Sequence, residues 1–136
     1  MMKATTMKTR ILLVDDHPIY RNGLKSLIAL QNDMEIVGEA ENGQEAIVKT
    51  RKHHPNIILM DINMPVMNGI EATRRILAEM PDTKILALSM WSDDGNRSEM
   101  MRAGARKYLL KDGDIEELIA AIREAADSSK TSQAPH

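Results

Sequence analysis

The feature that most constrains the fold is a short apolar run, residues 57–60, that stops at Asp61 and a loop containing Pro and Gly. An apolar run of this length between turn signals is typical of a strand buried on both faces of a sheet. A second run, residues 11–14, also stops at acids, Asp15 and Asp16. Two such strands favour a parallel sheet covered by helices on both sides.

Strand and helix patterns alternate along the whole chain. The expected strands cover residues 10–16, 34–40, 57–61, 84–90 and 107–110. The expected helices begin near residues 18, 42, 69, 96 and 114, and the fourth has only a thin apolar face. Five repeats of strand and helix require parallel strands joined by right-handed crossovers. The sequence therefore predicts an α/β domain with a doubly wound, five-stranded parallel sheet and five helices.

The composition excludes several classes of protein and site. The chain has 136 residues and is 43% hydrophobic, which suits one domain with an aliphatic core. It has no Cys, so disulfides and thiolate chemistry are excluded, and its net charge of -2 gives no basic surface for nucleic acid. No apolar run has membrane-spanning length. We expect a cytoplasmic domain at 10–126, a disordered leader at 1–9, and a tail or linker at 127–136.

Four of the five predicted strands end in residues that can carry out chemistry: Asp15 and Asp16, Asp61, Ser89 and Lys111. In a parallel sheet these ends lie at one edge, where ligands bind in open α/β sheets. Carboxylates gathered there repel one another, and a divalent cation relieves the repulsion. Mg²⁺ prefers oxygen ligands, so Asp16 and Asp61 are natural ligands with Asp15 nearby, and the backbone carbonyl of Asn63 could complete the set.

A phosphoryl group would give each of these side chains a role. Asp61 is a nucleophile that can carry the group as an acyl phosphate, and it needs no general base because it is already ionised. Mg²⁺ and the Lys111 ammonium would offset the charge on the phosphoryl oxygens, and the Ser89 hydroxyl would donate to one of them.

Taken alone, each of these residues has an ordinary structural explanation. Asp16 could simply cap a helix, and Ser89 could form a hydrogen bond with the backbone. Lys111 could be a surface lysine whose aliphatic chain lies along the protein while its ammonium reaches solvent. Tyr108 could simply fill the core. The histidines lack other metal ligands in a recognisable pattern and are expected to be surface residues: His17, His53 and His54. The joint occurrence of acids, hydroxyl and lysine at successive strand ends favours function.

As a set, these residues resemble the receiver domain of the response regulators of two-component signalling. The resemblance covers about residues 10–126, and its motifs stand at residues 13–17, 60–65, 67–69, 88–89 and 104–112. The variant with Asp16-His17-Pro18 and Lys111-Asp112 is similar to the NarL/LuxR-type subfamily. The resemblance implies a flavodoxin-like fold with strand order 2-1-3-4-5.

The resemblance also implies roles for the strand-end residues. Asp61 would accept phosphate from a phosphohistidine of a sensor histidine kinase, and Asp15 and Asp16 would hold Mg²⁺. Ser89 would be the switch hydroxyl, whose movement toward the phosphoryl group lets Tyr108, the aromatic switch, turn inward. Lys111 would be the family's lysine.

Regulators of this subfamily normally carry a C-terminal DNA-binding output domain, and a homodimer is possible. This segment itself is expected to bind neither nucleic acid nor membrane. Two positions depart from the family pattern. Asp112 stands where many receivers have Pro, which removes the usual reason for a cis peptide there. Val66 stands at a loop position often held by Gly or another small residue.

Three alternative functions remain. A haloacid-dehalogenase-like phosphohydrolase also uses an Asp nucleophile and Mg²⁺, but it needs a second acid where this chain has Asn63. A flavodoxin-like flavin binder needs a phosphate-binding loop of Ser, Thr and Gly, whereas residues 15–18 are largely acidic. A stand-alone receiver could act through protein contacts only.

Overall fold

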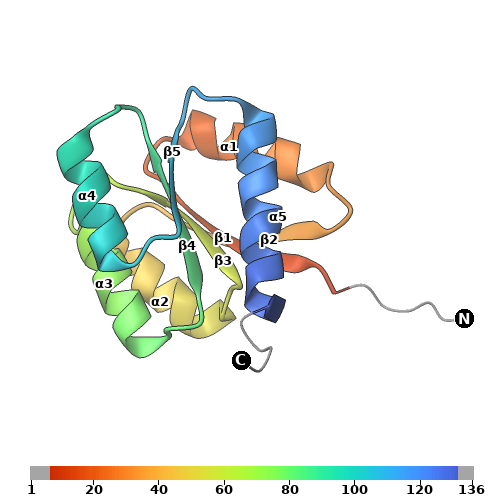
Figure 1. The fold of residues 1–136 in the computed structure, drawn as a ribbon, viewed down its shortest axis with the longest axis horizontal. Helices are drawn as coiled ribbons and strands as arrows, with labels where there is room; N and C mark the ends of the chain where they lie inside the picture. Colours follow the sequence, from red (N-terminus) through yellow and green to blue (C-terminus); the bar gives the residue numbers. More distant parts are fainter. Residues whose placement is uncertain (1–6, 132–136) are drawn as a thin grey trace, which may run out of the picture.

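The computed structural model describes residues 7–131 and contains a five-stranded parallel sheet with helices on both faces (Figure 1). The strands are β1 (Thr9–Val14), β2 (Met34–Ala40), β3 (Ile57–Asp61), β4 (Lys84–Ser89) and β5 (Lys107–Leu110). The helices are α1 (Pro18–Ala29), α2 (Gly43–His53), α3 (Gly69–Glu79), α4 (Asp94–Ala103) and α5 (Ile115–Thr131). The strand order is β2-β1-β3-β4-β5, which confirms the predicted flavodoxin-like topology.

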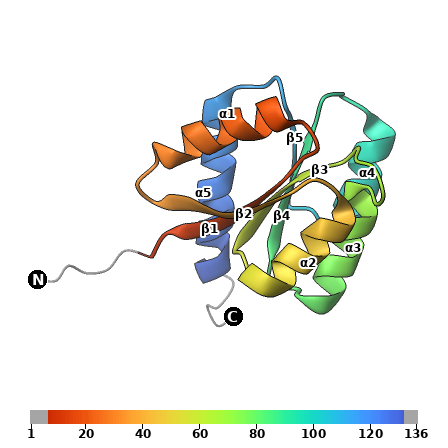
Figure 2. The ribbon, with the colours of Figure 1, turned by 180° about the vertical axis from the view of Figure 1, so that it is seen from behind.

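The two faces of the sheet carry separate apolar clusters. Alternate residues of a strand point to opposite faces, so Ile11 packs with α1 and α5 whereas Leu12 packs with α2, α3 and α4. Figures 1 and 2 show the same division, with α1 and α5 on one side of the sheet and the other three helices on the opposite side. Within residues 7–131, no helix combines the length and apolar character needed to cross a membrane.

Helix α4 is the least buried of the helices that cover the sheet. Among its described residues only Met100 is buried, and the sulfur of Met100 lies 3.7 Å from the Thr73 hydroxyl of α3. The thin apolar face predicted for this helix is therefore present. Little apolar contact holds α4 in place, so its free energy of local displacement is low compared with that of its neighbours.

Side chains at the helix starts explain why the helices begin where they do. The Asn42 side chain accepts a hydrogen bond from the Glu45 N–H at 2.9 Å, as the capping pattern predicts. The Glu45 carboxylate in turn accepts from the Glu41 N–H at 2.9 Å, one residue earlier than the usual capping box. In contrast, the N-cap of α1 is His17, whose side chain makes no capping bond, and Pro18 follows it.

The first strand and the last helix extend past the domain limits expected from composition. Strand β1 begins at Thr9, inside the expected leader, because the Thr9 N–H donates to the Asp33 carbonyl at 2.8 Å. Helix α5 continues to Thr131, inside the expected tail, because no Gly or Pro interrupts the chain before Pro135. Residues 1–6 and 132–136 of the expected leader and tail lie outside the described part, so the domain limits stay a prediction.

The loop after β3 contains a strained turn at Val66. Met67 donates its N–H to the Pro65 carbonyl at 2.7 Å, which closes a γ-turn around Val66. The φ of Val66 is 69°, and a γ-turn with positive φ is the rare, strained form. A β-branched residue is poorly suited to this backbone, and the Val66 side chain is 82% exposed, so packing does not compensate.

Replacing Val66 with Gly should stabilise the protein. Relief of about 1–3 kcal/mol of backbone strain outweighs the roughly 0.5–1 kcal/mol that the flexibility of Gly costs. We expect a gain of about 1 kcal/mol in the free energy of unfolding, measured as a higher urea midpoint with an unchanged slope. The matched control is Val48→Gly in α2, also exposed, which should lower stability by roughly 0.5 kcal/mol. Loss of stability in Val66→Gly would contradict the assignment of strain.

Candidate functional site

The ends of β1, β3, β4 and β5 bring the predicted site residues to one edge of the sheet. Val14 pairs with Met60, so Asp15 and Asp61 stand at the same level on neighbouring strands. Ser89 pairs with Leu110, and Lys111 follows directly. The start of α3 also packs closely against the end of β3. A Cβ on residue 69 would collide with the Asp61 carbonyl oxygen, so only Gly allows α3 to begin there.

Lys111 is a buried lysine directed into this edge. Its ammonium nitrogen lies 2.7 Å from Asp15 Oδ2 and 3.4 Å from Asp61 Oδ2, and its side chain is 2% exposed. The Tyr20 ring centroid lies 4.9 Å from the same nitrogen. These contacts exclude the alternative of an ordinary surface lysine.

The carboxylates at this edge outnumber the one buried ammonium beside them, that of Lys111. Asp15 is fully buried, and the side chain of Asp61 is 4% exposed. Burial, and then the charge of Asp15, raise the pKa of Asp61 to about 6 despite the opposing effect of Lys111. Asp16 Oδ1 is buried and accepts no hydrogen bond within the described residues, and Asp61 Oδ2 has only the long contact with Lys111 at 3.4 Å and a remote His17 nitrogen at 4.0 Å. The uncompensated negative charge and these free lone pairs fit a bound cation.

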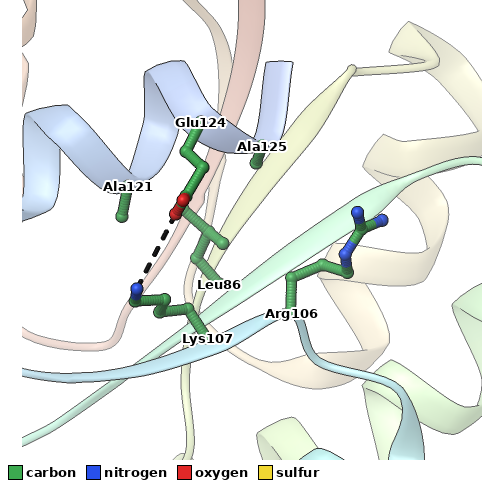
Figure 3. Close-up of a pocket in the computed structure, with 6 residues that line it drawn as sticks. All are labelled: Leu86, Arg106, Lys107, Ala121, Glu124 and Ala125. Carbon is green, nitrogen blue, oxygen red and sulfur yellow. Dashed lines mark ion pairs between the residues drawn. The ribbon is translucent and has the colours of Figure 1, made fainter. Parts of the chain in front are cut away.

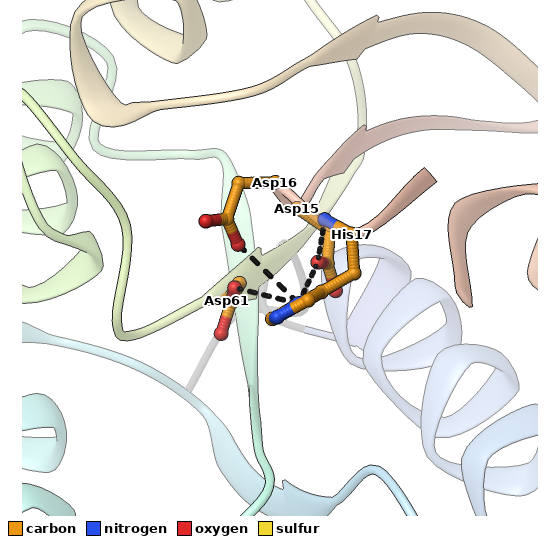
Figure 4. A group of neighbouring side chains, drawn as sticks. All are labelled: Asp15, Asp16, His17 and Asp61. Carbon is orange, nitrogen blue, oxygen red and sulfur yellow. Dashed lines mark hydrogen bonds and ion pairs between the residues drawn. The ribbon is translucent and has the colours of Figure 1, made fainter. Parts of the chain in front are cut away.

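Four side chains could hold that cation. Asp15, Asp16, His17 and Asp61 each offer one ligand atom, and these atoms lie within 4.8 Å of one another (Figure 4). The donor set is rich in carboxylate oxygen, which suits a hard divalent ion such as Mg²⁺. Asn63 lies in the exposed loop after β3, and the role predicted for its backbone carbonyl stays a prediction.

His17 lies at the surface, as expected, but the expectation that it lacks other metal ligands nearby is wrong. Its side chain is 58% exposed, yet Nδ1 lies 2.9 Å from Asp15 Oδ1 and 3.3 Å from Asp16 Oδ1. The ring of Tyr20 lies over Lys111, and burial followed by the charge of Asp15 raises the pKa of the Tyr20 hydroxyl to about 12. The position of His17 directly after the acid pair was the available signal for it.

Ser89 and Tyr108 meet at one backbone carbonyl, not at Asp61. The Ser89 hydroxyl donates to the Trp91 carbonyl at 3.1 Å and accepts from the Trp91 N–H at the same distance. The Tyr108 hydroxyl donates to the same carbonyl at 2.9 Å, and the Tyr108 ring is already buried. Ser89 therefore makes the backbone contact that its ordinary structural explanation predicts, and the Tyr108 ring is turned inward.

Two surface hollows lie away from the carboxyl edge. One, of about 270 Å³, lies between α5 and the strands β4 and β5, and the Lys107–Glu124 ion pair at 3.7 Å crosses it (Figure 3). The other, of about 670 Å³, lies between α1 and α5 and includes Leu27 and Ile119. None of the clustered acids lines either hollow, so the chemistry at the edge is separate from both.

Removing the Asp61 carboxylate should stabilise the protein at neutral pH. Because the pKa of Asp61 is higher in the folded state, folding favours the protonated carboxyl. The stability gained from the protonated form is lost as pH rises through about 6, where Asp61 ionises in the folded protein. Asp61→Asn should therefore unfold at higher urea concentration than wild type at about pH 7.5 in EDTA, by on the order of 1–3 kcal/mol, and the gain should vanish near pH 4. Lys111 keeps Asp15 as its partner.

The control for this measurement is Asp82→Asn in the exposed turn before β4, which should change stability little at either pH. Equal stability of Asp61→Asn and wild type at pH 7.5 would contradict the conclusion that burial and repulsion destabilise the ionised Asp61.

Comparison with known proteins agrees with this geometry. The model of the response regulator receiver domain family matches residues 11–123. The transcriptional regulatory protein DegU of Brevibacillus brevis is 40% identical over 119 residues, which are 88% of this chain and 50% of that protein. The oxygen regulatory protein NreC of Staphylococcus carnosus (strain TM300) is 40% identical over 115 residues, which are 84% of this chain and 53% of that protein.

A solved structure of a LuxR-family two-component response regulator from Aurantimonas sp. SI85-9A1 superimposes with a TM-score of 0.84. It is 37% identical in sequence, and the match covers 88% of this chain and 86% of that one. The chain spans about half the length of the curated relatives it matches. The family model, the relatives and the topology agree: the chain belongs to the receiver domains of two-component response regulators, among relatives of the NarL/LuxR type.

Proposed function

We propose that Asp61 accepts a phosphoryl group from a phosphohistidine of a sensor histidine kinase. The observation that carries this proposal is the buried Lys111 ammonium, which lies within 3.4 Å of carboxylate oxygens of both Asp15 and Asp61. Asp61 is the acid at the centre of the sheet edge, and an ionised carboxylate is a nucleophile. The carboxylate forms the new bond to phosphorus as the bond to the histidine nitrogen breaks.

The surrounding residues neutralise charge during the transfer. The Lys111 ammonium attracts the phosphoryl oxygens, and its contact with Asp15 keeps it at this position. Asp15, Asp16 and Asp61, with the Asn63 carbonyl, would hold Mg²⁺, which supplies positive charge to the phosphoryl oxygens when bound. The chain is then a phosphoacceptor that assists its own phosphorylation and dephosphorylation, and not an enzyme that turns over an external substrate.

The shared Trp91 carbonyl offers a route from phosphorylation to a change of shape. If Ser89 turns its hydroxyl to a phosphoryl oxygen, the Trp91 carbonyl loses one of its two donors. The loop 90–93 and α4, which is held by little apolar contact, can then shift, and the buried Tyr108 ring keeps the vacated space filled. Such a shift is a packing change biased by one added charge.

The output of this switch lies in a larger protein. The matched relatives are about twice as long as the aligned segment, and DegU is named as a transcriptional regulator. We infer that phosphorylation of Asp61 controls a DNA-binding output domain, directly or through a homodimer of receivers. A receiver that acts through protein contacts only is the alternative.

Acetyl phosphate with Mg²⁺ should add one phosphoryl group to wild type and none to Asp61→Asn, because the amide is not a nucleophile. Intact mass spectrometry measures the gain. Asp82→Asn is the matched control and should be labelled like wild type. Labelling of Asp61→Asn to the same extent would exclude Asp61 as the acceptor, and continuous hydrolysis of a phosphomonoester would favour the phosphohydrolase.

Trp91 fluorescence should report the movement of its loop. Saturating beryllofluoride with Mg²⁺ should change the emission of wild type, because Trp91 lies two residues after Ser89 and is 66% exposed. The change should be much smaller in Ser89→Ala, whereas Ser92→Ala, in the same exposed loop, should respond like wild type. An unchanged wild-type spectrum would contradict the loop movement.

A further inference from the structure

The ring of Tyr20 covers the buried ammonium of Lys111. The ring centroid lies 4.9 Å from Lys111 Nζ, which is within the range of an attractive cation–π contact. Tyr20 lies in the first turn of α1, whereas Lys111 directly follows β5. The Tyr20 side chain also packs against the apolar cluster between the sheet and the helices α1 and α5. The core therefore holds the ring from one side while the ammonium meets it on another.

The ring differs in kind from the polar partners of the ammonium. Lys111 Nζ lies 2.7 Å from Asp15 Oδ2, 3.2 Å from His17 Nδ1 and 3.4 Å from Asp61 Oδ2. A further carboxylate in place of the ring would accept one of the three N–H donors of the ammonium and cancel its charge. An aromatic face attracts the ammonium through its quadrupole and does neither. The charge and the donors therefore stay available to an incoming anionic group.

Burial of both partners strengthens this contact. A cation–π contact is stronger when the cation is removed from water, and the Lys111 side chain is only 2% exposed. Burial, and then the charges of Asp15 and Asp61, raise the pKa of the Tyr20 hydroxyl to about 12. The ring therefore stays neutral at physiological pH, and it lies close enough to the carboxylates to sense their charge.

We propose that Tyr20 is a positioning residue for phosphoryl transfer, because its ring holds the Lys111 ammonium beside Asp61. A lysine ammonium is a point charge on a flexible four-carbon stem. Without the ring, the ammonium would spend less time at the position between Asp15 and Asp61 from which it can reach a phosphoryl oxygen. The inference rests on the proposed function and adds to it a residue that acts through Lys111.

The test compares Tyr20→Leu with Tyr20→Phe. Leu keeps an apolar side chain in the core but has no aromatic face, whereas Phe keeps the ring and lacks the hydroxyl. With acetyl phosphate and Mg²⁺, the initial rate of labelling, measured by intact mass spectrometry, should fall on the order of fivefold in Tyr20→Leu. It should stay close to the wild-type rate in Tyr20→Phe. Ile19→Leu changes the neighbouring residue of α1, which is 88% exposed, and is the matched control.

Mg²⁺ affinity separates positioning from general damage to the site. A less firmly held ammonium repels a nearby cation less, so Tyr20→Leu should bind Mg²⁺ at least as tightly as wild type in calorimetry without a phosphoryl donor. A distorted site would bind Mg²⁺ more weakly. The NMR signals of the Lys111 Cε protons should also be shifted upfield by the ring in wild type and Tyr20→Phe, and should lose that shift in Tyr20→Leu.

Labelling of Tyr20→Leu at the wild-type rate would overturn the proposal. Parallel losses of labelling and Mg²⁺ affinity in that variant would also overturn it, since Tyr20 would then have only a structural role. Equally slow labelling of Tyr20→Phe would assign the effect to the hydroxyl and reject the role of the ring. The proposed function fails if wild type takes up no phosphoryl group, whereas a labelled wild type with an unaffected Tyr20→Leu rejects this inference alone.

Discussion

The structure depends on keeping like charges together at the buried edge of a sheet. Asp15 and Asp61 stand at the ends of neighbouring strands. Two lysines are buried within the described residues, and only Lys111 lies at this edge, because Lys84 begins β4 at the other end of the strands. Repulsion and burial make the ionised Asp61 unfavourable, which raises its pKa to about 6. The same excess of negative charge favours the binding of a cation, which would offset it. Strongly shifted pKa values of this kind are typical of functional sites.

Much of the fold and the acid cluster could be predicted from the sequence, because both follow from simple periodicities. Apolar runs that stop at polar residues predict buried parallel strands, and parallel strands bring their carboxyl ends to one edge. Asp15, Asp61 and Lys111 meet there for that reason. The confirmed strand order and family resemblance rest on the same residues.

The features that were missed depend on side-chain directions and backbone angles that no periodicity encodes. The His17 ring could face either solvent or the acids. Its direction depends on where α1 begins relative to the acids, because His17 is the N-cap of that helix. The Tyr20 ring lies over Lys111 because two segments far apart in sequence meet. Ser89 bonds to the backbone of Trp91, and no periodicity of the sequence specifies which partner a hydroxyl at a strand end takes. The extent of α5 was missed because polar residues at a helix end resemble a tail.

Because the two apolar clusters are separate, the two faces of the sheet can change independently. Tyr20 packs against the cluster of α1 and α5, whereas Tyr108 packs in the cluster of α2, α3 and α4. A charge placed on Asp61, which lies between them, can loosen the weakly held α4 without disturbing the opposite layer. The surface formed by α4 can therefore change while the surface formed by α1 and α5 keeps its shape.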